Sequence, residues 1–159
     1  RFTEQPRGGE GVAFPVDGER TVQLVGRIDR IDYRPSTNEW IVFDYKTGEN
    51  AHGPDKTHRA GDEWIDLQLP LYRHLAKTLG VDGQVKLAYL RLPRDTNAVS
   101  EQIADWSAEQ LDSADEAARR VISAILDGQF WDQLETEPRT LSEYGPICQD
   151  GVFDREAVV

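Results

Sequence analysis

The chain has 159 residues, 38% of them hydrophobic, which is enough for one hydrophobic core and too few for two domains. Its 18 basic and 29 acidic side chains give a net charge of −11, the wrong sign for a protein whose affinity comes from neutralising phosphates. It has no apolar run of membrane-spanning length, no signal-peptide pattern and one cysteine. We therefore expect one soluble domain over residues 1–159, in a reducing cytoplasm.

The N-terminal part of the chain is polar and rich in glycine and proline. Because it begins at Arg1 rather than at methionine, we expect a piece of a longer protein. Glycines and prolines divide residues 1–20 into short extended pieces, for which we predict one or two short strands. Residues Thr21–Tyr33 alternate polar and apolar side chains, which indicates a strand with one buried face and a bulge near Gly26.

A turn at residues 35–38 separates this strand from a compact apolar run, Trp40–Phe43. We predict a β-hairpin whose second strand ends in three polar residues, Asp44, Tyr45 and Lys46. Side chains alternate along a strand, so Asp44 and Lys46 share one face while Tyr45 points to the other.

The next segment favours a helix over residues Glu63–Leu79, capped by Asp62 and ended by Gly80. The other predicted elements are a polar loop over 49–61, a buried strand over 85–92, a weaker strand over 99–106, an amphipathic helix over 107–127 and an irregular tail from 129. Together they predict an α/β fold in which a mixed central sheet is flanked by helices.

Two carboxylates and a lysine converge on one edge of the predicted hairpin. Asp29 lies on the first strand, and Asp44 and Lys46 end the second. Carboxylate oxygens suit Mg²⁺ or Mn²⁺, which bind through one or two carboxylates plus substrate phosphate. Such a metal could activate water for phosphodiester hydrolysis, while Lys46 orients or deprotonates that water and stabilises the transition state.

Spacing alone leaves two other interpretations open. In the first, the acidic residues of this edge form ordinary salt bridges with Arg27, Arg30 and Lys46. In the second, they hold a structural cation, which would favour Ca²⁺ and leave Lys46 without a role. An inward-facing lysine beside two metal carboxylates is hard to justify in the second interpretation.

Three segments resemble motifs of the PD-(D/E)XK nuclease superfamily, specifically its RecB-like branch. They are Gly26–Asp32 (GRIDRID), Phe43–Gly48 (FDYKTG) and Gln68–Tyr72 (QLPLY), in the order of the family's motifs. The nearest type is the AddB nuclease domain of bacterial recombination helicase-nucleases. The resemblance implies a restriction-endonuclease-like core and a DNA exonuclease for repair or recombination. It also implies Mg²⁺ or Mn²⁺ as cofactor and a helicase domain or subunit as partner.

Carried over residue by residue, the resemblance implies that Asp29 and Asp44 are metal ligands and that the backbone carbonyl of Tyr45 completes the coordination. It implies that Lys46 is the catalytic lysine. Asp32 is the weaker candidate ligand, because it lies on the opposite strand parity from Asp29.

The same resemblance assigns Gln68 and Tyr72 to the family's glutamine-tyrosine motif, which lines the active site or the DNA side. The two residues are four apart, so they share one face of the predicted helix. We count both among the catalytic and nucleic-acid-binding residues.

Two features depart from the family pattern. Members usually have an earlier helix that donates an acidic residue to the metal, and no such helix precedes the first predicted strand. Glu4 lies in an extended segment, so we expect the missing first core helix upstream of Arg1. AddB-type domains often hold an iron-sulfur cluster through four cysteines; Cys148 alone cannot, so no cluster is predicted.

The alternative function is a catalytically silent nuclease-like module that binds nucleic acid or scaffolds a helicase partner. The missing early motif and the negative net charge favour it. The joint presence of Asp29, Asp44 and Lys46 argues against it, because a decaying site would lose one of them first.

Overall fold

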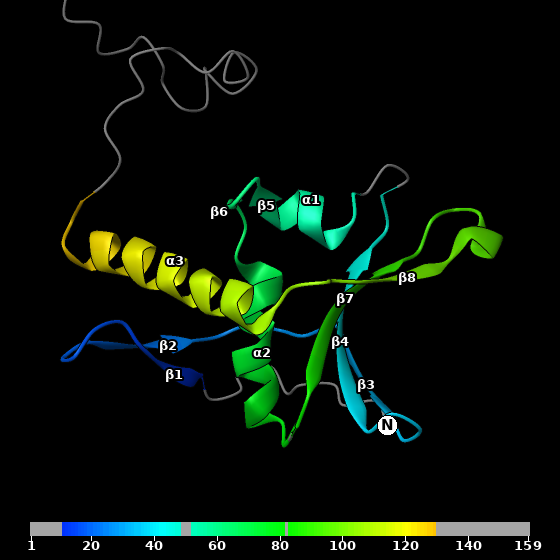
Figure 1. The fold of residues 1–159 in the computed structure, drawn as a ribbon, viewed down its shortest axis with the longest axis horizontal. Coiled ribbons are helices and arrows are strands. Elements are labelled where there is room, and N and C mark those ends of the chain that lie inside the picture. The colour runs from blue at the N-terminus through cyan, green and yellow to red at the C-terminus, as the bar shows by residue number, and fades with distance from the viewer. Residues whose placement is uncertain (1–10, 49–51, 82, 130–159) are drawn as a thin grey trace, which may run out of the picture. The chain divides into compact units, whose positions relative to one another are not determined.

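The structure is a computed structural model, and it describes residues 11–48, 52–81 and 83–129. Within these ranges the strands are β1 (Val12–Pro15), β2 (Thr21–Leu24), β3 (Arg30–Arg34), β4 (Glu39–Lys46), β5 (Arg59–Ala60), β6 (Glu63–Trp64), β7 (Val85–Arg91) and β8 (Ser100–Ile103). The helices are α1 (Pro54–His58), α2 (Gln68–Thr78), the 3₁₀ turn η1 (Thr96–Ala98) and α3 (Ala108–Leu126). Figure 1 shows their arrangement.

The central sheet has four strands in the order β3-β4-β7-β8. β4 pairs antiparallel with β3 and parallel with β7, and β8 is antiparallel to β7. Parallel neighbours need a crossover connection, and α2 supplies it between β4 and β7. The sheet is therefore mixed and flanked by helices, which confirms the predicted fold class.

The main hydrophobic core lies between this sheet and α2. It contains Ile28, Ile31, Val42, Leu69, Tyr72, Leu75, Ala76, Val81, Leu87 and Tyr89. A second buried cluster, Ile41, Phe43 and Ala88, lies on the opposite face of the sheet. Since β4 is buried on both faces, its first half is a continuous apolar run rather than an alternating one.

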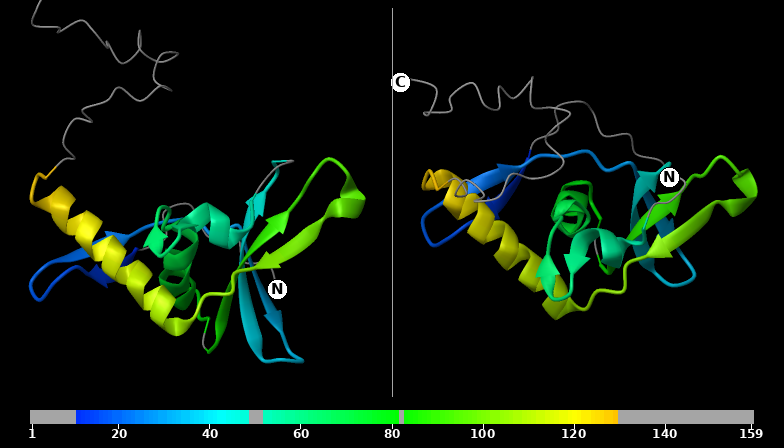
Figure 2. Two further views of the ribbon diagram at one scale, coloured as in Figure 1. Left: turned by 45° about the horizontal axis from the view of Figure 1, so that its top comes forward. Right: turned by 90° about the horizontal axis from the view of Figure 1, so that it is seen from above.

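Helix α2 lies between the sheet and α3, as the two views of Figure 2 show. The long helix α3 begins with a capping box formed by Ser107 and Gln110. Asp115 of α3 is 2.7 Å from Arg73 Nη2 and 2.8 Å from His74 Nε2, both on α2. These contacts join α3 to the helix that packs on the sheet.

The strand predicted over Thr21–Tyr33 is wrong as a single element. It is two strands, β2 and β3, which belong to different sheets and are separated by residues 25–29. The link passes close to α2, since a Cβ placed on Gly26 would lie 2.7 Å from Leu75 Cδ1. The irregularity expected near Gly26 is thus a break between two strands beside α2 rather than a bulge within one strand.

The predicted start of the helix over Glu63–Leu79 is also wrong, because the corresponding helix α2 begins at Gln68. Residues 59–64 instead form the small ribbon β5–β6, which turns at Gly61 with φ of 63°. Asp62 does not cap the helix, because the N-cap residue is Leu67; Asp66, just before it, accepts a hydrogen bond of 2.8 Å at Oδ1 from the Gln68 backbone N–H. The loop expected over 49–61 contains α1.

Three predicted elements are confirmed with small changes in their ends. The strand over 85–92 is β7, the weaker strand over 99–106 is β8, and the helix over 107–127 is α3. The predicted tail from 129, apart from that residue, lies outside the described residues, as do Glu4 and Cys148. No helix in the described ranges has the length and apolar character of a membrane span.

Candidate active site

Asp44 and Lys46 end β4 and point to the same side of the sheet. The Lys46 ammonium lies 2.7 Å from Asp44 Oδ2, while Tyr45 between them is turned outward and 38% exposed. Asp44 is only 5% exposed, so it is a charged side chain at the margin of the core. Strand alternation, as predicted from the sequence, brings the carboxylate and the amine together.

Asp29 reaches the same strand end from the link that precedes β3. The last pair of the β3–β4 ladder joins Arg30 to Phe43, so the Tyr45 backbone N–H has no partner on β3. This N–H donates instead to Asp29 Oδ2 at 2.9 Å. Asp29 is therefore held beside the backbone between Asp44 and Lys46, although it does not lie on a strand as predicted.

Helix α2 places Gln68 and Tyr72 next to the carboxylates. Gln68 Nε2 donates to the Tyr72 hydroxyl at 2.8 Å, as expected for residues four apart on one helical face. Burial raises the pKa of Tyr72 and, although the bond from Gln68 opposes the shift, the charges of Asp44 and Asp29 raise it further. The phenol thus stays protonated, and its proton can be donated to a carboxylate or phosphate oxygen.

The buried carboxylate of Asp44 is oriented toward cations. Its Oδ2 is shielded from solvent, has no hydrogen-bond partner and forms an ion pair with the Lys46 ammonium at 2.7 Å. A buried charged oxygen without a hydrogen bond is costly unless a cation compensates it. The donor chemistry of Asp44 therefore fits a hard divalent metal.

The described residues contain no group of three or more acidic, histidine or cysteine side chains that could enclose a metal. Mg²⁺ tolerates such a sparse site, because it keeps several waters and needs one or two carboxylates plus substrate oxygens. Structural Ca²⁺ takes six to eight oxygen ligands. The arrangement favours a substrate-assisted metal site over a structural calcium site.

Asp32 lies on the other face of the sheet. It pairs in register with Ile41, whose side chain belongs to the second buried cluster. Arg30 holds its carboxylate with two hydrogen bonds, 2.8 Å from Nε and 2.6 Å from Nη2. The salt-bridge interpretation thus describes Asp32 with Arg30, and it also describes the Asp44–Lys46 pair; the structure does not bring Asp32 to Asp44.

Sequence reasoning missed Tyr89 and His58. Tyr89 is opposite Asp44 in the β4–β7 register, and the Lys46 Nζ lies 4.6 Å from its ring centroid. The Tyr89 hydroxyl is 2.5 Å from His58 Nε2, and both residues are 1% exposed. A hydroxyl within the apolar strand was the available signal, because a buried tyrosine hydroxyl needs a partner.

A groove of about 390 Å³ opens beside Gln68 and Tyr72. Its other lining residues are Leu24, Val25, Gly26, Arg27, Leu71 and Leu75. Val25 is 73% exposed there, and Arg27 is exposed two residues before Asp29. An apolar surface with a basic residue thus adjoins the carboxylates.

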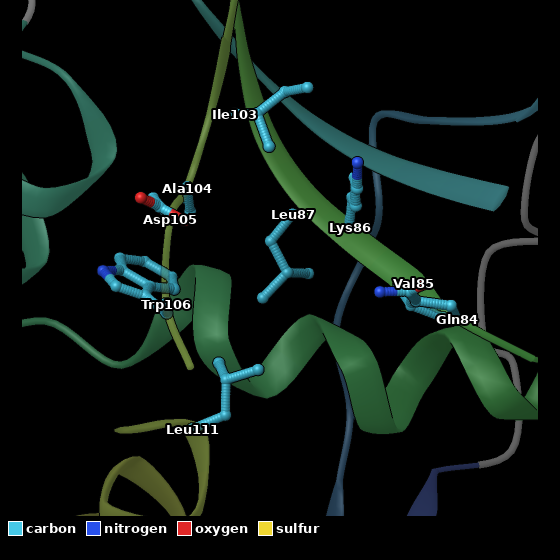
Figure 3. Close-up of a pocket in the computed structure, with 9 residues that line it drawn as sticks. All are labelled: Gln84, Val85, Lys86, Leu87, Ile103, Ala104, Asp105, Trp106 and Leu111. Atoms are coloured by element: carbon cyan, nitrogen blue, oxygen red, sulfur yellow. The ribbon is translucent and has the colours of Figure 1, made fainter. Parts of the chain in front are cut away.

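Another pocket, of about 380 Å³, lies near the start of β7, where Leu87, Trp106 and Leu111 surround it (Figure 3). Leu87 pairs with Val42, two residues before Asp44, so the pocket extends away from the carboxylates toward the opposite end of the strand. It has no part in the candidate site.

A family model described as the PD-(D/E)XK nuclease superfamily matches residues 1–149. The match includes the three segments with the family's motifs, and in the structure these segments supply the carboxylates, the lysine and the glutamine-tyrosine pair of one site. No curated protein and no solved structure matches the chain. Since the match covers nearly the whole sequence, the chain belongs to the PD-(D/E)XK nuclease superfamily.

Proposed function

We propose that the chain is a metal-dependent deoxyribonuclease that hydrolyses phosphodiester bonds at the end of β4. The observation that carries the proposal is the convergence of Asp29, Asp44 and Lys46, with one shielded Asp44 oxygen left without a hydrogen bond. Membership of a nuclease superfamily whose members generally use divalent metals supports it. Phosphodiester hydrolysis requires compensation of charge, and this is what carboxylate-bound metal and a lysine provide.

Mg²⁺ or Mn²⁺ held by Asp29, Asp44 and the Tyr45 carbonyl would supply an acidified water and a Lewis acid for the scissile phosphate. Lys46, whose side chain is 29% exposed, contacts both the buried carboxylate and solvent. Its ammonium can orient the attacking water or stabilise the charge that develops on the phosphate. Tyr72, held by Gln68, can donate its phenolic proton on the same side.

The groove beside α2 is suited to one strand of DNA. Apolar side chains can contact bases or sugars, and Arg27 at the groove can contact a phosphate. Exonuclease action in repair or recombination, the AddB-type branch of the RecB-like group and a helicase partner are further parts of the proposal. They are supported by the order of the three motifs.

The second candidate function is the silent module, which binds nucleic acid or a helicase without cleaving. The net charge of −11 favours it, because few phosphate contacts can be expected from so acidic a chain. The presence of the carboxylates and Lys46 at one strand end favours catalysis.

The test is degradation of end-labelled single- and double-stranded DNA by the chain in Mn²⁺, compared with Lys46→Ala. We expect the variant to lose about 100-fold or more in rate, the scale of removing one transition-state contact. Lys77→Ala is the matched control, because this lysine is exposed in the last turn of α2. Closed circular DNA separates exonuclease from endonuclease action. Metal-independent DNA binding without cleavage would support the silent module.

A further inference from the structure

We propose that Tyr89 is a positioning residue, which holds the Lys46 ammonium against the face of its ring while His58 fixes that ring through the hydroxyl group. The catalytic consequence rests on the proposed nuclease function. The contact itself does not, so the two can be tested separately.

The contact follows from the parallel pairing of β4 and β7. Tyr89 pairs with Asp44, and both point to the α2 side of the sheet, where Lys46 follows one alternation later. Lys46 Nζ lies 4.6 Å from the ring centroid, within the range of about 6 Å for a cation–π interaction. Since Tyr89 is 1% exposed, its ring is shielded from solvent, while the Lys46 side chain keeps 29% exposure; partial desolvation of the contact strengthens the attraction.

The ring attracts the ammonium without competing for the metal. The other contact of Lys46, with Asp44 Oδ2, involves the oxygen that also suits a divalent cation. When a divalent metal binds Asp44, the carboxylate attracts the Lys46 ammonium less strongly. The neutral ring of Tyr89 keeps its attraction and thereby limits the freedom of a long, flexible side chain.

The Tyr89 ring is itself held at its hydroxyl end by His58. His58 Nδ1 lies 2.9 Å from the Asp66 carbonyl oxygen and 3.2 Å from Asp66 Oδ1, which are both acceptors. Nδ1 therefore carries the proton, and Nε2 accepts a hydrogen bond of 2.5 Å from the Tyr89 hydroxyl. Burial raises the pKa of Tyr89 to about 12, so this hydroxyl remains a donor across the neutral range.

The chain of contacts links two parts of the site. Asp66, which holds His58, also accepts a hydrogen bond from the Gln68 backbone N–H at the start of α2. His58 ends α1, which lies on the side of the sheet where β4 ends (Figure 1). The segment between β4 and α2 thus positions the lysine as well as the glutamine-tyrosine helix.

The contact can be tested by NMR without any activity. The chain has four lysines, so ¹³C labelling of the lysine ε-carbons produces four signals, which single Lys→Arg variants assign. We expect the Lys46 signal to be shifted upfield by the ring current, to move to the position of exposed lysines in Tyr89→Leu and to stay shifted in Tyr89→Phe. A Lys46 signal that Tyr89→Leu leaves unchanged would overturn the proposal.

The catalytic consequence is tested by graded weakening of the ring face. Phenylalanine at position 89, and then phenylalanines carrying one, two and three fluorines, keep nearly the same volume but attract a cation progressively less. We expect kcat to fall stepwise, on the order of tenfold over the series, with KM for DNA unchanged. A merely structural role for the ring predicts one kcat for all four proteins, which would refute positioning.

Circular dichroism checks whether Tyr89→Leu is folded. If it is not, the phenylalanine series, which keeps the ring and nearly its volume, still tests the proposal. If the wild-type chain cleaves no DNA in Mn²⁺ while the Lys46 signal behaves as expected, the proposed nuclease function fails and the ring contact stands. If cleavage occurs but neither the signal nor kcat responds to the ring, the positioning role fails alone.

Discussion

Asp44 combines burial with charge at a single position. It is 5% exposed, its Oδ2 accepts no hydrogen bond, and its nearest cationic neighbour is Lys46. Core packing alone would favour an apolar residue at the end of a strand that carries Ile41, Val42 and Phe43. A carboxylate at this position is the basis of the proposal that Asp44 binds a metal.

Asp44→Asn is expected to abolish the stabilisation that Mn²⁺ gives the wild-type chain. The amide keeps the size of the side chain but removes the negative charge that a divalent metal requires. Without metal, the melting temperature should change little, because the substitution removes a buried charge while Lys46, 29% exposed, stays hydrated without the ion pair. Thermal unfolding with and without Mn²⁺ measures both effects. Asp32→Asn, on the other face, should retain the metal-induced rise; an equal rise in Asp44→Asn would contradict the ligand role.

At the scale of elements, α2 is the piece on which the site depends. It packs on the sheet through Leu69 and Leu75, borders the link that holds Asp29, and is tied to α3 through Asp115. Displacement of α2 would therefore move the carboxylate link and the Gln68–Tyr72 pair together.

The ion pair between α2 and α3 should make stability depend on acid pH. Burial raises the pKa of Asp115, but hydrogen bonds from Arg73 and His74 outweigh it and leave the pKa below the ordinary 3.8. A lowered pKa means that this carboxylate stabilises the fold above pH 3.8 and that the contribution disappears as the pH falls through the lowered value.

Asp115→Asn should therefore lose about 2 kcal/mol at neutral pH, less than for a fully buried pair because Arg73 is partly exposed. The difference from wild type should shrink below pH 3.8. Urea unfolding at neutral pH and below pH 3.8 measures the free energy of unfolding of both proteins. Asp112→Asn is the control, because the Asp112 side chain is 75% exposed. A difference that is constant with pH would show that the charge is not responsible.

Gly26→Ala tests the close passage of residues 25–29 by α2. The new methyl group would meet Leu75 Cδ1 at 2.7 Å, so either this flexible side chain or the link must shift. We expect a loss of about 1 kcal/mol in the free energy of unfolding, at the low end of overpacking, together with slower cleavage because Asp29 follows three residues later. Gly18→Ala, where no atom lies within 4 Å, is the matched control and should be neutral. Equal stability of the two variants would contradict the close packing.

For the whole molecule, the net charge of −11 limits how DNA can be held. Repulsion between an acidic surface and phosphates leaves local features, such as Arg27 and a metal bound at the proposed site, to provide the attraction. Binding by this chain should accordingly depend on divalent cations.

We expect the affinity for single-stranded DNA to rise when Ca²⁺ replaces EDTA and to fall only shallowly with monovalent salt, because few phosphates are neutralised by side chains. Fluorescence anisotropy with a labelled oligonucleotide measures both, and Asp44→Asn should lose the Ca²⁺ effect. Tight binding in EDTA with a steep salt dependence would instead favour the silent module.

The sequence by itself determined the features that depend on local periodicity. Strand alternation placed Asp44 and Lys46 on one face, and helical spacing paired Gln68 with Tyr72. The extents of β7 and α3 followed from patterns within single segments. Each of these features depends on residues close together in the chain, so it could be predicted without knowledge of long-range contacts.

Only the tertiary structure decided where Asp29 leaves the strand, where α2 begins and which aromatic ring meets Lys46. The link at Gly26 is shaped by Leu75, nearly fifty residues away in the sequence. Tyr89 and His58 join the site because β7 pairs in parallel with β4, and the register of such a pair is set by a crossover rather than by a turn. Contacts between distant segments, which periodicity does not encode, account for these differences.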